Sequence, residues 1–78
     1  MPISLRLSKK LKSVLRWLRR HYPVKRPVRV RLVPPSKAGD WEGLCVYDKD
    51  SVYIKLRAGN SDGEMAETLL EEWSHSLR

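Results

Sequence analysis

Apolar and polar residues alternate along this chain with two different periods, and each period predicts a type of secondary structure. In residues 5–21 the apolar positions recur every three or four residues, which is the spacing of one helix face. These positions are Leu7, Leu11, Val14, Leu15 and Leu18. Ser4 or Ser8 is expected to cap the start of this helix. Pro23 is expected to end it, because proline has no backbone N–H to donate.

Three segments in the middle of the chain alternate with period two, which predicts β-strands. Residues 28–33 read Val-Arg-Val-Arg-Leu-Val, so Val28, Val30 and Leu32 share the inner face and Arg29 and Arg31 share the outer face. Residues 44–47 and 51–57 are expected to form a hairpin that turns at residues 48–50. In its second strand the expected inner face is Val52, Ile54 and Leu56, and the expected outer face is Tyr53, Lys55 and Arg57. Residues 36–43 are expected to be a loop, with Gly39, Asp40 and Gly43 as turn formers.

A second helix is predicted after Ser61, because Ser61 and Glu64 have the spacing of a capping box. Its apolar face contains Met65, Leu69, Trp73 and Leu77, and is widened by Ala66 and Leu70. The elements therefore run helix, three strands, helix. We expect one α+β domain over residues 1–78, with a three-stranded antiparallel sheet packed by a basic N-terminal helix and a C-terminal helix.

The length of 78 residues allows one small core and no enclosed catalytic cavity, because a domain of this size buries only about 60% of its unfolded surface. No stretch is apolar over enough residues to span a bilayer, and the start of the chain lacks a signal-peptide pattern. The single cysteine, Cys45, has no partner for an internal disulfide. A reducing, cytoplasmic setting is therefore expected.

Charge divides the chain into two parts. Residues 1–37 contain twelve Lys or Arg and no acidic residue, whereas residues 38–78 contain nine acidic residues and four basic ones. The net charge of +7 is thus the balance of +12 and −5. This asymmetry predicts an acidic or polyanionic partner for the first part. The candidate partner-binding cations are Arg16, Arg19, Arg20, Lys25, Arg26, Arg29 and Arg31.

Three kinds of partner fit these cations. Nucleic acid would contact them through phosphates while Tyr22 or Trp17 stacks on a base, without sequence-specific reading. An anionic membrane would suit Trp17 and the leucines, but those leucines are needed to cover the sheet. A protein or nucleoprotein would dock on the basic face of residues 6–31. Trp41 is either an aromatic anchor for such a partner or a lid over the core.

Residues 71–75 read Glu-Glu-Trp-Ser-His, close to the His-Glu-x-x-His pattern of zinc protease helices. The surrounding segment resembles the metal helix of small zincin-like proteins of the SprT-like type, many of them carried by phages and mobile elements. That helix commonly reads Thr-Leu-Leu-His-Glu-Trp-Ala-His. The positions that match it in place are Thr68, Leu69, Leu70, Glu72, Trp73 and His75.

Two departures from this family bear on activity. Glu71 stands where the first metal-binding His would be, and the family's third ligand comes from a segment after this helix that the sequence lacks. A catalytic zinc needs three protein ligands and an open position. Glu71 and His75 are weak metal candidates and are more simply interpreted as an i,i+4 pair on the helix surface. We therefore expect no metal, no other cofactor and no catalytic residue, with a zinc-dependent protease as the alternative.

The resemblance also implies a setting. A small, strongly polarised chain on a disabled phage-type enzyme scaffold suits an inhibitor or adaptor of the general kind of phage anti-CRISPR proteins. The sequence thus predicts a non-catalytic phage or mobile-element protein in the host cytoplasm. It would bind an acidic protein or nucleoprotein through its basic face, and non-specific nucleic-acid binding is the alternative.

Overall fold

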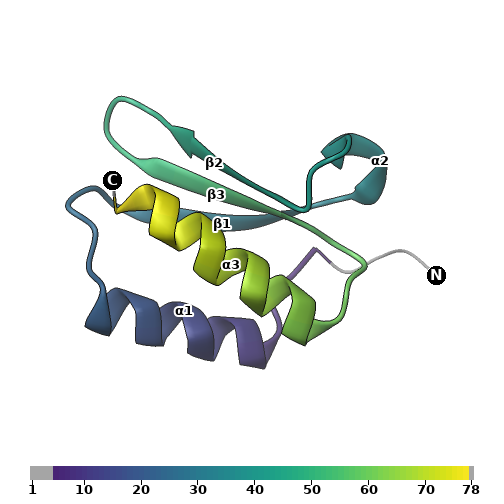
Figure 1. Ribbon diagram of the computed structural model, residues 1–78, viewed down its shortest axis with the longest axis horizontal. Helices are drawn as coiled ribbons and strands as arrows, with labels where there is room; N and C mark the ends of the chain where they lie inside the picture. The colour runs from purple at the N-terminus through teal and green to yellow at the C-terminus, as the bar shows by residue number, and fades with distance from the viewer. Residues whose placement is uncertain (1–4, 78) are drawn as a thin grey trace.

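The computed structural model describes residues 5–77 and places two helices against one face of a three-stranded sheet (Figure 1). The elements are α1 (Lys9–His21), β1 (Val28–Val33), α2 (Pro35–Ala38), β2 (Gly43–Tyr47), β3 (Val52–Arg57) and α3 (Asp62–Ser76). The predicted order of helix, three strands and helix is confirmed, as is the α+β class. The short helix α2 is an addition to that order.

The sheet is mixed, so the prediction of an antiparallel sheet is wrong in one of its two strand pairs. The strand order is β1-β3-β2, with β2 antiparallel to β3 and β1 parallel to β3. The chain reverses direction between β1 and β2 and again between β2 and β3, so β1 and β3 run the same way. β1 pairs with β3 rather than with β2, and that pairing makes the sheet mixed.

Serine side chains cap both long helices. The Ser8 hydroxyl accepts a hydrogen bond from the Leu11 amide at 3.2 Å, so α1 begins at Lys9 rather than at residue 5. The other predicted cap, Ser4, lies outside the described residues. The Ser61 hydroxyl accepts from the Glu64 amide, also at 3.2 Å, which confirms the cap predicted for α3. Each cap satisfies one backbone donor that the first helical turn leaves unpaired.

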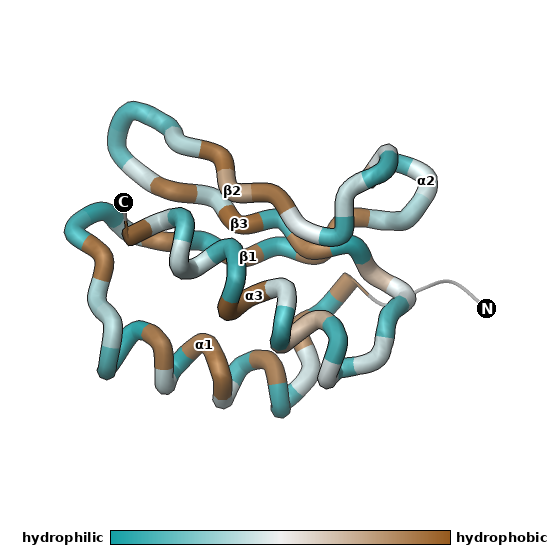
Figure 2. Tube along the Cα trace, viewed as in Figure 1, coloured by the Kyte–Doolittle hydropathy of each residue, from teal (hydrophilic) through white to brown (hydrophobic). Residues whose placement is uncertain are grey.

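The core lies between the helices and the inner face of the sheet, where apolar residues recur along each element (Figure 2). Its buried residues are Leu11, Leu15 and Leu18 of α1, Val28 and Leu32 of β1, Val52, Ile54 and Leu56 of β3, and Met65, Leu69 and Trp73 of α3, together with Ala58. The predicted inner faces of these helices and strands are therefore confirmed. Leu70 and Leu77 are corrections: both are exposed, because Leu70 is turned about 100° from the buried Leu69 and Leu77 follows the last helical residue.

The segment predicted as a loop over residues 36–43 is more ordered than expected. Pro35 is the first residue of α2, a position where its missing N–H has no cost. Gly39 ends α2 with a φ of 62°, which favours glycine. Gly43 is the first residue of β2 rather than a turn residue. A Cβ at Gly43 would lie 2.4 Å from the Thr68 Cγ2 atom, so this glycine lets α3 approach the sheet closely.

Candidate functional site

The exposed side of α1 carries half of the twelve cations that the sequence places in residues 1–37. Its cations are Lys9, Lys10, Lys12, Arg16, Arg19 and Arg20, and all six are exposed. None of them forms an ion pair with a carboxylate in residues 5–77. The buried leucines of α1 hold this helix against the core by the opposite side. The six cations therefore form a surface whose positive charge is not neutralised by an ion pair within residues 5–77.

Aromatic rings stand beside these cations at the end of α1. The Trp17 ring centroid is 4.9 Å from that of His21 and 5.5 Å from that of Tyr22. Trp17 is 48% exposed and Tyr22 is 50% exposed, so this ring cluster is half open to solvent. Arg16 and Arg20 directly precede Trp17 and His21 in the sequence. We call Arg16, Trp17, Arg20, His21 and Tyr22 the α1 surface.

Arg19 forms a side-chain hydrogen bond, which no other α1 cation does within residues 5–77. Its guanidinium donates from Nη2 to the carbonyl oxygen of Val28 at 2.8 Å. Val28 is the first residue of β1, which is an edge strand of the sheet. Arg19 therefore ties α1 to the sheet edge and satisfies a carbonyl there. Its guanidinium is less available to a partner than those of Arg16 and Arg20.

Arg29 and Arg31 lie on the other side of the sheet. Their neighbours Val28 and Leu32 are buried beneath the helices, and side chains alternate between the two faces of a strand. Both arginines are exposed, and the Arg31 guanidinium lies 6.0 Å from the centre of the Tyr53 ring. The cations predicted to form one basic face are therefore divided between α1 and the outer face of the sheet.

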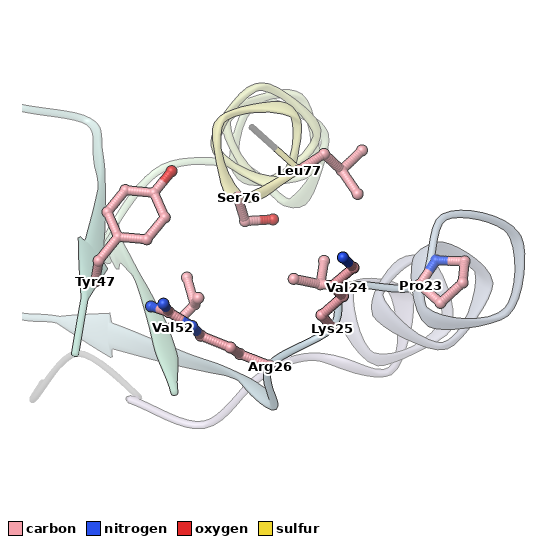
Figure 3. Close-up of a pocket in the computed structure, with 8 residues that line it drawn as sticks. All are labelled: Pro23, Val24, Lys25, Arg26, Tyr47, Val52, Ser76 and Leu77. Atoms are coloured by element: carbon pink, nitrogen blue, oxygen red, sulfur yellow. The ribbon is translucent and has the colours of Figure 1, made fainter. Parts of the chain in front are cut away.

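Lys25 and Arg26 line a hollow of about 460 Å³ between the end of α3 and the segment that connects α1 to β1 (Figure 3). Apart from Lys25, the polar side chains among its described lining residues are bonded to backbone carbonyls. Arg26 donates to the Asp48 carbonyl at 3.1 Å, Tyr47 donates its hydroxyl to the His75 carbonyl, and Ser76 donates to the Trp73 carbonyl. These bonds join the connection, the hairpin and α3 into one structure. The described residues that line the hollow include no carboxylate and no histidine side chain.

Trp41 lies at the other end of the sheet from Lys25 and Arg26. It is half-buried in the connection between α2 and β2, beside Gly39. Figure 1 shows α2 at one end of the sheet and the α1–β1 connection, which carries Lys25 and Arg26, at the other. The fold therefore does not bring Trp41 together with the cations of that connection.

Glu71 and His75 both lie on α3, where Glu71 is exposed and His75 is half-buried. No ion pair joins them, so the predicted i,i+4 contact is not formed within residues 5–77. In the same residues, no group of three or more His, Cys, Asp or Glu side chains is placed to hold a metal ion. These two side chains alone do not make a catalytic zinc centre, which needs three protein ligands.

Cys45 faces α3 from β2 and is half-buried. Burial raises the pKa of its thiol, a hydrogen bond with the Tyr47 side chain opposes that increase, and the negative charge of Glu72 adds to it. The thiolate is the nucleophilic form of cysteine, so a raised pKa lowers the fraction of Cys45 that is nucleophilic at neutral pH. Cys45 therefore suits packing against the core better than nucleophilic attack.

One arrangement was missed in the sequence. The parallel pairing puts Arg29 beside Tyr53 and Arg31 beside Lys55, so cations and an aromatic ring from two strands meet on the outer face of the sheet. Alternation alone assigned each of these residues to an outer face. Their proximity depends on which strands pair and in which register. The periodicity of residues along the sequence gives no information on pairing or on register.

Comparison of the chain with models of protein families, with curated proteins and with solved structures gave no match. Within residues 5–77, no helix is long and apolar enough to cross a membrane. The functional argument therefore depends on the surfaces described above.

Proposed function

We propose that this protein is a non-catalytic inhibitor or adaptor that docks on an acidic protein or nucleoprotein through the α1 surface. One observation carries the proposal: half-exposed aromatic rings stand beside arginines that form no ion pair within residues 5–77. Trp, Tyr and Arg are the residues most enriched at interface hot spots. The surrounding lysines of α1 would steer an acidic partner towards this cluster.

The wider setting belongs to the same proposal. The resemblance of residues 68–75 to the metal helix of SprT-like proteins suggests a phage or mobile-element protein that acts in the host cytoplasm, as anti-CRISPR proteins do. Proteolysis is not proposed, because Glu71 and His75 have no third metal-binding side chain beside them in residues 5–77. Protein purified without chelator should bind zinc at far less than one ion per chain. A stoichiometric zinc content measured by elemental analysis would contradict the non-catalytic assignment.

The test of the docking surface compares two double variants that remove the same charge from opposite sides of the molecule. Arg16→Gln with Arg20→Gln changes the α1 surface, whereas Arg29→Gln with Arg31→Gln changes the outer face of the sheet. Tagged wild type and both variants are used to capture partners from nuclease-treated host lysate, followed by mass spectrometry. The first variant should lose the captured partner, and the second should keep it.

Trp17→Ala gives a second test that does not alter charge. Truncating a hot-spot aromatic costs about 2 kcal/mol or more of binding free energy, so the captured partner should fall below detection in stringent washes. Leu44→Ala removes an exposed apolar side chain from the sheet and is the control. Retention of the partner by Trp17→Ala and by the Arg16 and Arg20 double variant would refute the proposed docking surface.

A further inference from the structure

The outer face of the sheet is open, because α1 and α3 both cover the inner face (Figure 1). Two rows of side chains cross this open face. Arg29 is in register with Tyr53, and Arg31 is in register with Lys55. Arg29 and Arg31 are exposed, and Tyr53 and Lys55 are half-buried. We call these four residues the sheet surface.

Positive charge is concentrated on this surface without an acid between its members. Arg31 and Lys55 are direct neighbours on adjacent strands, and like charges opposite each other destabilise a sheet. Two acids stand at the ends of β2: the Glu42 carboxylate lies 3.8 Å from the Arg57 guanidinium, and Asp48 is in the hairpin turn. An anion lying over β1 and β3 would relieve this repulsion, so the charges favour a negatively charged ligand.

Tyr53 adds a ring to this cationic surface. The Arg31 guanidinium lies 6.0 Å from the ring centroid, which is within the range of a cation–π contact. Bases of single-stranded nucleic acid stack on aromatic rings whatever their sequence, and arginine contributes to such stacks. Arg29 and Arg31 are two residues apart on one strand, roughly 6.6 Å, which is comparable to the spacing of successive phosphates in an extended strand.

We propose that the sheet surface binds single-stranded nucleic acid. Arg29 and Arg31 would contact consecutive phosphates along β1, Lys55 would contact the next phosphate or sugar, and one base would stack on Tyr53. This activity goes beyond the proposed function, because it uses the face of the molecule opposite to α1. The protein would then hold a nucleic-acid strand on one side and an acidic partner on the other.

Single strands fit this surface better than the other polyanions do. In a duplex the faces of the bases are covered by their neighbours, so Tyr53 would have nothing to stack on. An acidic protein would satisfy the cations but would not require the ring. Binding that depends on both the ring and the arginines is therefore specific to an unpaired nucleic-acid strand.

The experiment measures fluorescence anisotropy of labelled oligothymidylate, about 15 nucleotides long, against full-length protein at salt from about 50 to 200 mM. Tyr53→Thr keeps a residue that suits a strand and removes the ring, so affinity should fall about 5- to 150-fold. Tyr53→Phe keeps the ring and should bind within about twofold of wild type.

The arginines are tested through salt dependence. For single strands, each phosphate contact adds about 0.7 to the slope of log affinity against log salt. Arg29→Gln with Arg31→Gln should therefore weaken binding and reduce that slope by about 1.4. Arg16→Gln with Arg20→Gln removes the same charge from α1 and should leave the slope close to that of wild type. This contrast separates the sheet surface from the α1 surface.

Several results would overturn the proposal. These are no binding of oligothymidylate at the lowest salt, equal affinity for a duplex of the same length, or equally effective competition by polyglutamate. A loss of binding in the Arg16 and Arg20 variant but not in the Arg29 and Arg31 variant would also overturn it. If Tyr53→Thr does not fold, amide chemical shifts of the wild type decide: oligothymidylate must move those of β1 and β3 and leave those of α1 unchanged.

Discussion

The two long helices each carry a tryptophan, and the two side chains differ in how deeply they are buried. Trp73 of α3 is 2% exposed, and its indole Nε1 donates to the Tyr22 carbonyl at 2.9 Å. Trp17 of α1 is 48% exposed and contacts only its neighbours His21 and Tyr22 among aromatic rings of residues 5–77. The comparison shows that α3 is built into the structure, whereas α1 presents its tryptophan to solvent.

The polar groups of the helices differ in the same way. On α3, the Thr68 and Ser76 hydroxyls donate to backbone carbonyls of the same helix, and the His75 carbonyl accepts from Tyr47. On α1, the cations apart from Arg19 make no side-chain hydrogen bond within residues 5–77. Groups that the fold does not use are free to bind another molecule, which is the physical basis for assigning the docking role to α1.

The largest expected effect on stability is that of Trp73→Ala, and Trp17→Ala is its comparison. Trp73→Ala should lower the free energy of unfolding by about 3–5 kcal/mol, because it opens a cavity in a small core and leaves a carbonyl unpaired. Trp17→Ala should lower it by about 1 kcal/mol or less, because half of that side chain is already in water. Urea denaturation followed by circular dichroism measures both. Equal losses would contradict the division of roles between the helices.

Gly43→Ala tests how closely α3 packs against β2, and its expected effect on stability is intermediate. Gly43→Ala places a Cβ 2.4 Å from the Thr68 Cγ2 atom and 3.1 Å from the Glu72 Cγ atom. Overpacking of this kind costs about 1–3 kcal/mol of stability. Thr68→Ser removes the methyl group and keeps the hydroxyl, so it should recover part of the loss in the double variant. Additive losses measured in a double-mutant cycle would show that the close approach is absent.

Local patterns were enough to predict the two long helices, whereas they did not predict which strands pair. Ser61 and Glu64 predicted the start of α3, and alternation over Val52, Ile54 and Leu56 predicted the buried face of β3. Alternation is the same in parallel and antiparallel strands, so it did not reveal that β1 pairs with β3. β3 is the central strand, and its apolar face is completely buried. Which strand becomes central depends on how all elements pack around the core.

The same limit applies to the candidate site. A run of cations along the sequence predicted a basic face, but the backbone sends Arg16 and Arg20 to one side of the molecule and Arg29 and Arg31 to the other. Alternation in the strand and helical periodicity correctly predicted that these four arginines are exposed. Whether two exposed residues share a surface depends on how the elements pack, and the sequence has no local signal for that.

Reversing a charge at the start of α1 should have a smaller effect, with opposite signs for stability and for partner binding. Lys9 and Lys10 lie in the first turn, where the helix dipole is positive and a carboxylate is preferred. Lys10→Glu should therefore stabilise the fold by about 0.3–1 kcal/mol at low salt, and less at high salt. The same change should weaken capture of an acidic partner. Thermal unfolding at two salt concentrations measures the first effect, and no salt dependence would contradict the electrostatic explanation.

The smallest expected effect concerns the thiol between β2 and α3. Because burial and the charge of Glu72 raise the pKa of Cys45, the native thiol should react with iodoacetamide more slowly than the urea-unfolded chain near pH 8, and should reach half-maximal reactivity at higher pH. A raised pKa means that the native state holds this proton more tightly, so the stability it contributes is present at neutral pH and is lost as pH rises through that pKa. Glu72→Gln removes the nearby negative charge and should move the native midpoint down. If the midpoint of Glu72→Gln is unchanged, the charge of Glu72 does not affect the pKa of Cys45. Burial alone would then raise that pKa, and α3 would act on the thiol only by packing against it.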